Sequence, residues 1–207
     1  MTHDLVLYTN PMSRGRIARW MLEETGAPYR TEILAYGDAM KSPGYLAINP
    51  MGKVPAVTHG ARVVTECPAI CAYLADAFPG AGLAPSTADR AAYYRWLFFA
   101  AGPLEAAVTN KAIGAEPGED QRRMVGYGSL ATVLDVLEDA LSDREYIAGE
   151  RFSAADVYLG SHIGWGMQWG TIDQRRVFTD YWQRLAERPA CRRAKQLDDE
   201  AMEGTDH

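Results

Sequence analysis

The chain has 207 residues, 47% hydrophobic and 23% charged, and these proportions exclude a disordered or fibrous protein. Its formal net charge of −6 argues against nucleic acid as a partner. Apolar runs such as "WLFFAAG" are too short to span a membrane and no signal segment opens the sequence, so we expect a cytoplasmic protein without membrane contact. The spacing of Cys67, Cys71 and Cys191 fits neither a disulfide framework nor a metal site, so we expect reduced thiols and no metal.

The first 80 residues alternate between strand-like and helix-like segments. The predicted strands are 4–9, 29–34, 54–57 and 62–65, and the predicted helices are 13–26 and 68–78. Their order is βαβ followed by ββα. Ser13 is suited to cap the first helix and Gly26 to end it. The apolar residues in and before this helix fit one stripe: Met12, Ile17, Trp20 and Met21.

The sequence changes character near residue 80, where two prolines and two glycines interrupt any regular pattern between residues 79 and 85. A domain boundary fits this composition. We therefore predict a first domain over residues 1–79, a linker over 80–86 and an all-helical second domain over 87–207.

The second part of the chain shows only helical patterns. Ser86 and Asp89 form a cap pattern before a long apolar segment, 91–110, which Pro103 should kink. Another helix is predicted over residues 119–141.

The stretch "FSAADV" gives the clearest helix start in the chain. Ser153 would be the N-cap with Asp156 three residues later, while Phe152 and Val157 are placed for a hydrophobic staple. We interpret this motif as structural.

A proline stands where the third strand should begin, in "INPMGKVPAV". Proline removes a donor from a strand ladder, so it belongs at an edge, a bulge or the first residue of a strand. If the Val54–Pro55 bond is cis, the turn leaves the N–H and C=O of Val54 free to pair with the backbone of a short peptide-like ligand. The pattern alone is equally that of an ordinary edge proline.

Four stretches in the same order and spacing give the chain a family resemblance: "YTNPMSRGR", "NPMGKVPAV", "TECPAICAYL" and "YIAGERFSAADV". The chain resembles the soluble (cytosolic) glutathione transferases, of the bacterial type with a serine-type active site. The resemblance implies an α/β thioredoxin-like N-terminal domain that binds glutathione, followed by an all-α C-terminal domain. It also implies a homodimer in which each N-terminal domain contacts the helical domain of its partner.

The resemblance assigns glutathione binding to particular residues. Val54 would hold the cysteinyl backbone, with Pro55 as the cis residue, and Lys53 would lie close to the glutathione backbone or its carboxylates. Glu66 and Cys67 stand where the family has an acid followed by Ser or Thr, at the start of the helix that receives the γ-glutamyl group. Such a helix N-terminus offers free N–H groups and partial positive charge to a carboxylate.

Catalysis in this family makes the glutathione thiol a thiolate near neutral pH. Ser13 is our first candidate for the stabilising hydroxyl, because it follows Tyr8 by the five residues typical of serine- and cysteine-type members. Tyr8 is the alternative, because the tyrosine-type members use a hydroxyl from the end of this strand. Asn10 would orient the site or the ligand sulfur.

The resemblance places the electrophile site against the inner face of the long helix of the second domain. Its candidate walls are aromatic, and aromatic residues at helical spacing also suit a core: Tyr94, Trp96, Phe99 and Trp165. The predicted activity is transfer of glutathione to an apolar small-molecule electrophile. A variant chemistry, namely dehalogenation, isomerisation or thiol-disulfide exchange through Cys67, and a binding protein without turnover remain alternatives.

Overall fold

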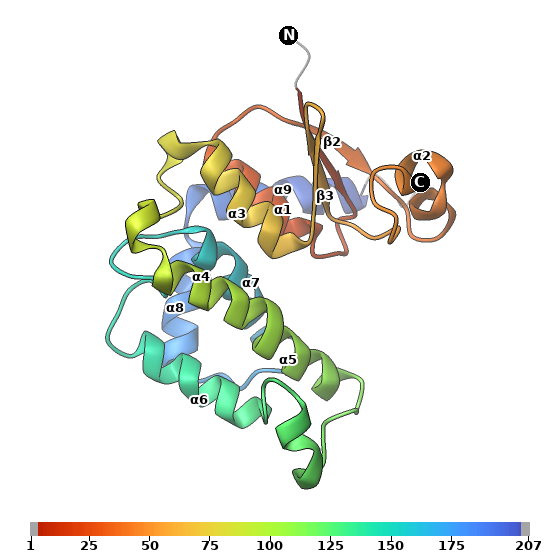
Figure 1. Cartoon of the computed structure of the whole chain (residues 1–207). Coiled ribbons are helices and arrows are strands. Elements are labelled where there is room, and N and C mark those ends of the chain that lie inside the picture. Colours follow the sequence, from red (N-terminus) through yellow and green to blue (C-terminus); the bar gives the residue numbers. More distant parts are fainter. Residues whose placement is uncertain (1–3, 204–207) are drawn as a thin grey trace. The chain divides into compact units, whose positions relative to one another are not determined.

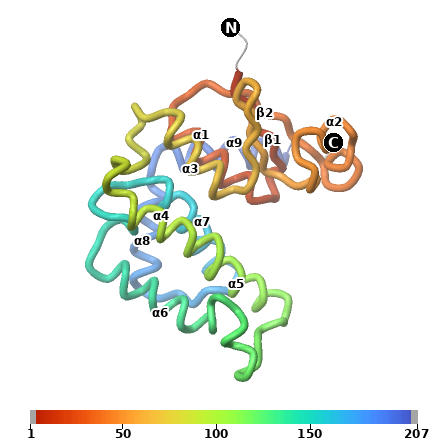
Figure 2. The backbone as a smooth tube through the Cα atoms, viewed as in Figure 1, coloured from red at the N-terminus to blue at the C-terminus, as the bar shows by residue number. Residues whose placement is uncertain are grey.

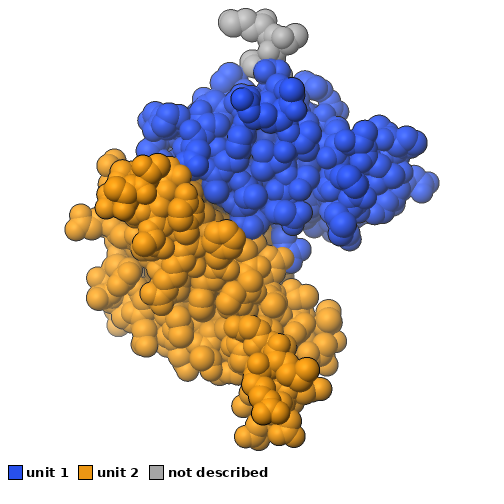
Figure 3. All heavy atoms as spheres, viewed as in Figure 1, with its two compact units in different colours: residues 1–83, 187–207 blue, residues 84–186 orange. Residues whose placement is uncertain are grey.

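The computed structural model describes residues 4–203, and the contacts within the chain divide it into two compact units. Unit 1 consists of residues 1–83 together with 187–207, and unit 2 consists of residues 84–186 (Figure 3). This division differs from the predicted one, which assigned all of 87–207 to the helical domain. The last helix of the chain packs in unit 1 instead.

Unit 1 is built on a four-stranded mixed sheet of strand order β2-β1-β3-β4. The strands are β1 (Leu5–Thr9), β2 (Arg30–Ile33), β3 (Ala56–His59) and β4 (Arg62–Thr65). β1 runs parallel to β2 and antiparallel to β3, which in turn pairs antiparallel with β4. All four predicted strands are present. β3 begins at Ala56, two residues later than predicted, because Pro55 has no N–H to donate to the ladder.

Helices cover unit 1, and α1 packs against both α3 and the C-terminal helix α9 (Figures 1 and 2). The helices are α1 (Gly15–Thr25), α2 (Pro43–Leu46), α3 (Cys67–Ala77) and α9 (Pro189–Glu203), with 3-10 turns at Asp38–Lys41 and Pro79–Ala81. Ile17, Trp20 and Met21 are buried as predicted. Met12 is 76% exposed, so the predicted stripe does not include it, because the helix begins at Gly15 and Met12 lies in the preceding loop.

The helix α9 joins unit 1 through ion pairs with α1. Arg19 Nε donates to Asp198 Oδ1 at 2.8 Å, and both side chains are nearly excluded from solvent, with exposures of 5% and 0%. Arg188 donates to both carboxylate oxygens of Glu24, at 2.7 and 2.8 Å. A buried charge is costly unless it is paired, so Arg19 needs α9 in place. The pairing of Arg19 with Asp198 therefore favours the packing of α9 on α1.

Unit 2 contains only helices, as predicted. They are α4 (Ala91–Phe99), α5 (Glu105–Ala112), α6 (Leu130–Leu141), α7 (Ala154–Gln168) and α8 (Arg176–Ala186), with 3-10 turns at Thr87–Asp89 and Glu119–Met124. Pro103 lies in a π-helical turn, Ala100–Leu104, that joins α4 to α5, so the predicted interruption is confirmed. The predicted helix over 119–141 is broken, because Gly128 adopts a φ of 68° that an α-helix does not accept.

The start of α7 forms the predicted capping box between Ser153 and Asp156. Asp156 is fully buried, and it accepts hydrogen bonds from the N–H of Ile147 at 2.8 Å and from the hydroxyl of Tyr181 at 2.8 Å. Burial raises the pKa of the Asp156 carboxyl, while these hydrogen bonds oppose the rise. The motif therefore ties α7 to its preceding loop and to α8, in agreement with its structural interpretation.

Among the helices of residues 4–203, none combines the length and the apolar character needed to cross a membrane. Nor does this part of the chain bring three His, Cys, Asp or Glu side chains together as a metal site.

Candidate active site at the carboxyl end of β1

The strand register brings three loops to one edge of the sheet. Tyr8 near the end of β1 lies opposite Ala56, the first residue of β3, and Ala56 lies opposite Thr65, the last residue of β4. The loop after β1, the Val54–Pro55 turn and the start of α3 therefore meet there. All the residues predicted to bind or activate glutathione lie in or next to these three segments.

Hydrogen bonds fix the loop that follows β1. The Asn10 side chain donates from Nδ2 to the carbonyl of Leu34 at 2.9 Å, and its Oδ1 accepts from the N–H of Met12 at 2.9 Å. The Tyr36 hydroxyl donates to the carbonyl of Met12 at 3.1 Å. Asn10 is only 9% exposed, so its side chain anchors the loop. This arrangement suits the orienting role that we expected for Asn10.

Ser13 lies at the N-terminal end of α1 and is half-buried. Its Oγ donates to the carbonyl of Asn10 at 2.7 Å and accepts from the N–H of Gly15 at 2.9 Å. The first turn of α1 contains no acidic residue, so nothing offsets the partial positive charge of this helix end. The predicted N-cap lies one residue too early, because α1 begins at Gly15 and Arg14 is its N-cap, but the Ser13 hydroxyl still binds the first helical N–H. This position also favours an anion.

Tyr8 lies on the other face of the sheet. Thr9, its neighbour, faces α1, because a Cβ built on Gly15 would lie 1.8 Å from Thr9 Oγ1. Successive strand residues point to opposite faces. The Tyr8 ring accordingly packs in the cluster of Met40, Tyr45 and Ala56, with its centroid 5.8 Å from that of Tyr45. Tyr8 and Ser13 therefore approach the sheet edge from different sides.

The turn before β3 presents free backbone groups. The Val54–Pro55 peptide bond is cis, and within residues 4–203 neither the N–H nor the C=O of Val54 has a hydrogen-bond partner. The carbonyl of the preceding residue, Lys53, accepts from Tyr45 Oη at 2.6 Å and from Asn49 Nδ2 at 2.8 Å. The Lys53 side chain is exposed. The turn is thus held from behind while Val54 stays available to a ligand.

The start of α3 contacts the loop after β1. Cys67 Sγ donates to the carbonyl of Arg14 at 3.6 Å, and Glu66, which precedes it, is exposed. Glu66 has a φ of 64°, the only positive φ among the described residues other than glycine. Such a backbone costs about 1–3 kcal/mol and clusters at functional sites. The first turn of α3 also lacks acidic residues.

Cys67 is buried and is not an accessible thiol. It is 5% exposed, and its hydrogen bond to Arg14 directs the sulfur toward the neighbouring loop. Cys71 is fully buried, and Cys191 is partly exposed. Burial raises the pKa of the Cys191 thiol to about 12, so its greater exposure does not make it a good nucleophile.

The predicted electrophile walls lie in unit 2 and differ in exposure. Tyr94 is 45% exposed, and its ring lies near the Arg90 guanidinium, which also donates to its hydroxyl at 3.2 Å. Trp96 is only 3% exposed and packs edge-on against Phe99, so it lies in the core of unit 2 and not on a surface open to a substrate. Phe99 and Trp165 are half-buried.

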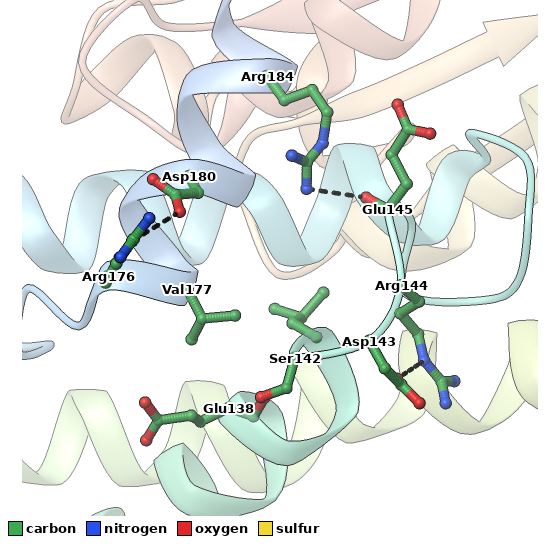
Figure 4. A pocket seen from close by; sticks show the side chains of 10 residues that line it. Glu138, Ser142, Asp143, Arg144, Glu145, Arg176, Val177, Asp180 and Arg184 are labelled. Atoms are coloured by element: carbon green, nitrogen blue, oxygen red, sulfur yellow. Dashed lines mark hydrogen bonds and ion pairs between the residues drawn. The ribbon is translucent and has the colours of Figure 1, made fainter.

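A hollow in the surface of unit 2 is lined by none of the predicted site residues. It encloses about 560 Å³ between the C-terminal end of α6, the loop at 142–145 and α8 (Figure 4). Its arginines already have partners: Arg144 pairs with Asp143, Arg176 with Asp180, and Arg184 donates to the carbonyl of Glu145. Because these arginines are already paired, this open surface offers no group for the predicted transfer of glutathione.

Comparison with known proteins defines the class. Residues 12–77 match the glutathione S-transferase N-terminal domain and residues 61–165 match the C-terminal domain. The chain is similar to glutathione S-transferase GstA of Escherichia coli O157:H7, with 32% identity over 149 residues, 70% of this chain and 73% of the relative. It is also similar to glutathione S-transferase F9 of Arabidopsis thaliana, with 30% identity over 167 residues, 72% of this chain and 76% of the relative.

A solved structure agrees with this class. The structure of a sphingomonad glutathione S-transferase complexed with glutathione has a TM-score of 0.76 to this chain at 28% identity, covering 94% of this chain and 98% of that one. The chain therefore belongs to the glutathione S-transferase family. It is a glutathione transferase that uses glutathione as co-substrate, and the predicted fold, a thioredoxin-like domain followed by helices, is confirmed.

Two residues that contact the site were not predicted from the sequence. Tyr36 reaches the loop from beyond β2, and Arg16 donates both to the Pro11 carbonyl, at 2.5 Å, and to Asp199, at 2.9 Å. The sequence offers no signal for the pairing of Arg16 with Asp199, because these residues are 183 positions apart.

Proposed function

We propose that Ser13 is the residue that stabilises the thiolate of bound glutathione for attack on an apolar electrophile. One observation carries the proposal: a half-buried hydroxyl stands at a helix N-terminus without acidic neighbours, at the sheet edge where Val54 offers an unpaired backbone N–H and C=O. Tyr8 is the weaker candidate, because its ring packs on the face of the sheet away from α1.

Glutathione would bind across the three loops at this edge. The backbone of its cysteinyl residue would pair antiparallel with Val54, as an added strand does. The γ-glutamyl carboxylate would take the free N–H groups at the start of α3, with Glu66 facing its ammonium group. Lys53, exposed beside Val54, would meet a carboxylate. Cys67 would contribute through the helix start and not through its own buried sulfur.

The energy required of Ser13 is modest. A free thiol has a pKa near about 8.5, and lowering it by about two units requires about 2.7 kcal/mol of preferential thiolate stabilisation. A hydrogen bond to a charged acceptor is worth about 1.5–3 kcal/mol. The positive end of α1 adds typically about 0.3–1 kcal/mol. The two together are sufficient.

The wider setting follows from the family. We propose a cytoplasmic detoxification enzyme that acts as a homodimer. The electrophile would contact the more accessible aromatic residues of unit 2, Tyr94, Phe99 and Trp165. Sedimentation at micromolar concentration tests the dimer. A purely monomeric protein would refute that part and leave the proposed chemistry standing.

The decisive experiment titrates the thiol of bound glutathione by the ultraviolet absorbance of its thiolate. Ser13→Ala should raise the apparent pKa and lower kcat with little change in the affinity for glutathione, because the lost bond favours only the reactive form. Tyr8→Phe, the matched hydroxyl deletion, should leave both values near those of the parent. The opposite pattern would transfer the role to Tyr8.

A further inference from the structure

The guanidinium of Arg16 connects the C-terminal helix to the loop that carries Ser13. Nε donates to the Pro11 carbonyl at 2.5 Å, while the terminal Nη2 donates to Asp199 Oδ1 at 2.9 Å and contacts Met202 Sδ at 3.5 Å. Asp199 and Met202 belong to α9. One side chain thus spans from the loop before α1 to the end of the chain.

Each carbonyl in the first half of this loop has its own donor. Asn10 accepts from the hydroxyl of Ser13, Met12 from the hydroxyl of Tyr36, and Pro11 from Arg16. The first donor lies within the loop and the second comes from beyond β2. Only the third is itself held by α9.

A flexible side chain holds a fixed direction only when both of its ends are bound. Arg16 is 23% exposed and Asp199 is 36% exposed, so without the carboxylate the guanidinium could turn toward water. The carboxylate therefore sets the plane of the guanidinium, and the Nε bond then sets the direction of the Pro11 carbonyl. Pro11 lies two residues before Ser13, within the same turn.

The other contacts between α1 and α9 do not reach the loop. Arg19 with Asp198 joins the two helices, and Glu24 with Arg188 joins α1 to the residue just before α9. They keep α9 on α1. The Arg16 contact is different, because it acts on the segment that presents the candidate catalytic hydroxyl.

We propose that Arg16 and Asp199 form a positioning pair, through which α9 sets the geometry of the Ser13 hydroxyl toward the sulfur of glutathione. The inference rests on the proposed role of Ser13. Neither residue is assigned contact with the substrate. Misplacement of a reacting group by about 1 Å can cost about a hundredfold in rate, so loss of the pair should lower kcat by about tenfold to a hundredfold. KM for glutathione should change by less than about twofold.

The experiment compares two ion pairs that join α1 to the C-terminal segment of the chain. Arg16→Met and Asp199→Asn remove the positioning pair, whereas Glu24→Gln removes the pair with Arg188 and serves as the matched control. Lys195→Met removes the exposed second partner of Asp199, to which Lys195 Nζ lies at 2.5 Å, and leaves Arg16 in place. For each variant, kcat, KM, the apparent pKa of bound glutathione and the unfolding free energy are measured.

The inference expects a lowered kcat and a raised thiol pKa in Arg16→Met and in Asp199→Asn, and parent values in both controls. Asp199→Glu should restore part of the rate. The double variant should be no worse than either single variant, because both remove one unit. Additive losses, or losses no larger than those of Glu24→Gln at equal stability, would overturn the inference.

The Ser13→Ala variant separates this result from the proposed function. If Ser13→Ala behaves like the parent enzyme, the role of Ser13 fails, and the positioning inference fails with it. If Ser13→Ala loses activity while the Arg16 and Asp199 variants match their controls, only the positioning inference is overturned.

Discussion

The hydroxyl proton of Ser13 points to the carbonyl of Asn10, at an oxygen–oxygen distance of 2.7 Å. A hydroxyl has one proton to donate. To stabilise a thiolate it must therefore turn from the carbonyl to the sulfur, while its lone pair can still accept from the N–H of Gly15. The proposed role of Ser13 therefore requires a rotation of this hydroxyl when glutathione binds.

Ser13→Ala should affect stability and catalysis by separate routes. Without ligand, loss of the bond leaves the N–H of Gly15 without its partner, which should lower the unfolding free energy by about 0.5–1.5 kcal/mol. Urea denaturation checks this value. Ser13→Gly removes the same hydroxyl and should lose the same catalysis. Equal stability of all three proteins would show that the Ser13 hydroxyl does not stabilise the helix start.

Asn10→Ala should loosen the loop at both ends, because the side chain bonds to Leu34 and to Met12. The buried carbonyl and N–H left unpaired should cost about 1–3 kcal/mol of stability. Calorimetry and kcat are the measurements. Asn10→Asp is the informative companion, since it keeps the acceptor for Met12 and loses the donor to Leu34. Its negative charge near the sulfur should raise the pKa of bound glutathione further than Asn10→Ala does.

Cys67→Ser should strengthen the contact between α3 and the loop. A hydroxyl is a better donor than a thiol to the Arg14 carbonyl, now 3.6 Å from the sulfur. Because this bond forms with or without glutathione, we expect it to raise the free energy of unfolding by about 0.5–1.5 kcal/mol, the net worth of one hydrogen bond, measured by urea denaturation. Cys67→Ala should show no gain.

Limited alkylation tests the same thiol. Since Cys67 is buried, we expect it to be labelled slowly in the folded enzyme. Rapid labelling of Cys67 that glutathione suppresses would contradict this expectation and show that Cys67 is a reactive thiol.

Gly15→Ala should displace the start of α1. A Cβ at this position would lie 1.8 Å from Thr9 Oγ1 and 2.9 Å from Ser13 Oγ, closer than atoms can approach. We expect a loss of about 1–3 kcal/mol in stability together with reduced kcat. Adding Thr9→Ala to the Gly15→Ala variant should restore part of the stability and part of kcat. Gly80→Ala, where no atom lies within 4 Å of the added carbon, is the control.

The pair of Asp199 with Lys195 and Arg16 should appear in the acid stability of the protein. The Lys195 hydrogen bond, and after it that of Arg16, lowers the pKa of the Asp199 carboxyl from its ordinary value of 3.8. A lowered folded-state pKa gives stability that is present above the unfolded pKa and is lost as the pH falls through the folded pKa. Parent and Asp199→Asn should therefore differ in urea midpoint near neutral pH and converge in acid. A constant difference across this range would contradict the assignment.

Local rules predicted most elements, and contacts between distant segments were missed. The periodicity of residues 4–78 and the cap at Ser153 are properties of short stretches, and the structure contains the predicted strands and helices. The placement of α9 depends on the pairing of Arg19 with Asp198, which no local pattern reveals. Likewise, Trp96 is buried and packs against Phe99, whereas the sequence shows only an aromatic residue at helical spacing.

The candidate site likewise combines features that the sequence predicts with features that only the structure shows. The proline turn and the serine after β1 are visible as motifs, and their meeting at one edge follows from the strand order. The direction in which each side chain points cannot be predicted from these motifs. Tyr8 and Ser13 both follow from the sequence as hydroxyls near the end of β1, and only the side of the sheet on which each lies separates them.

The pairing of Arg19 with Asp198 also imposes an order on biosynthesis. The carboxylate is 179 residues later in the chain than the guanidinium that it neutralises. At about 5–20 residues per second, a ribosome delivers it roughly 9 to 36 seconds after the arginine. Through this interval the nascent glutathione-binding unit has its strands but not its final helix, and a charge destined for the interior has no counterion. The unit that is translated first is therefore completed last.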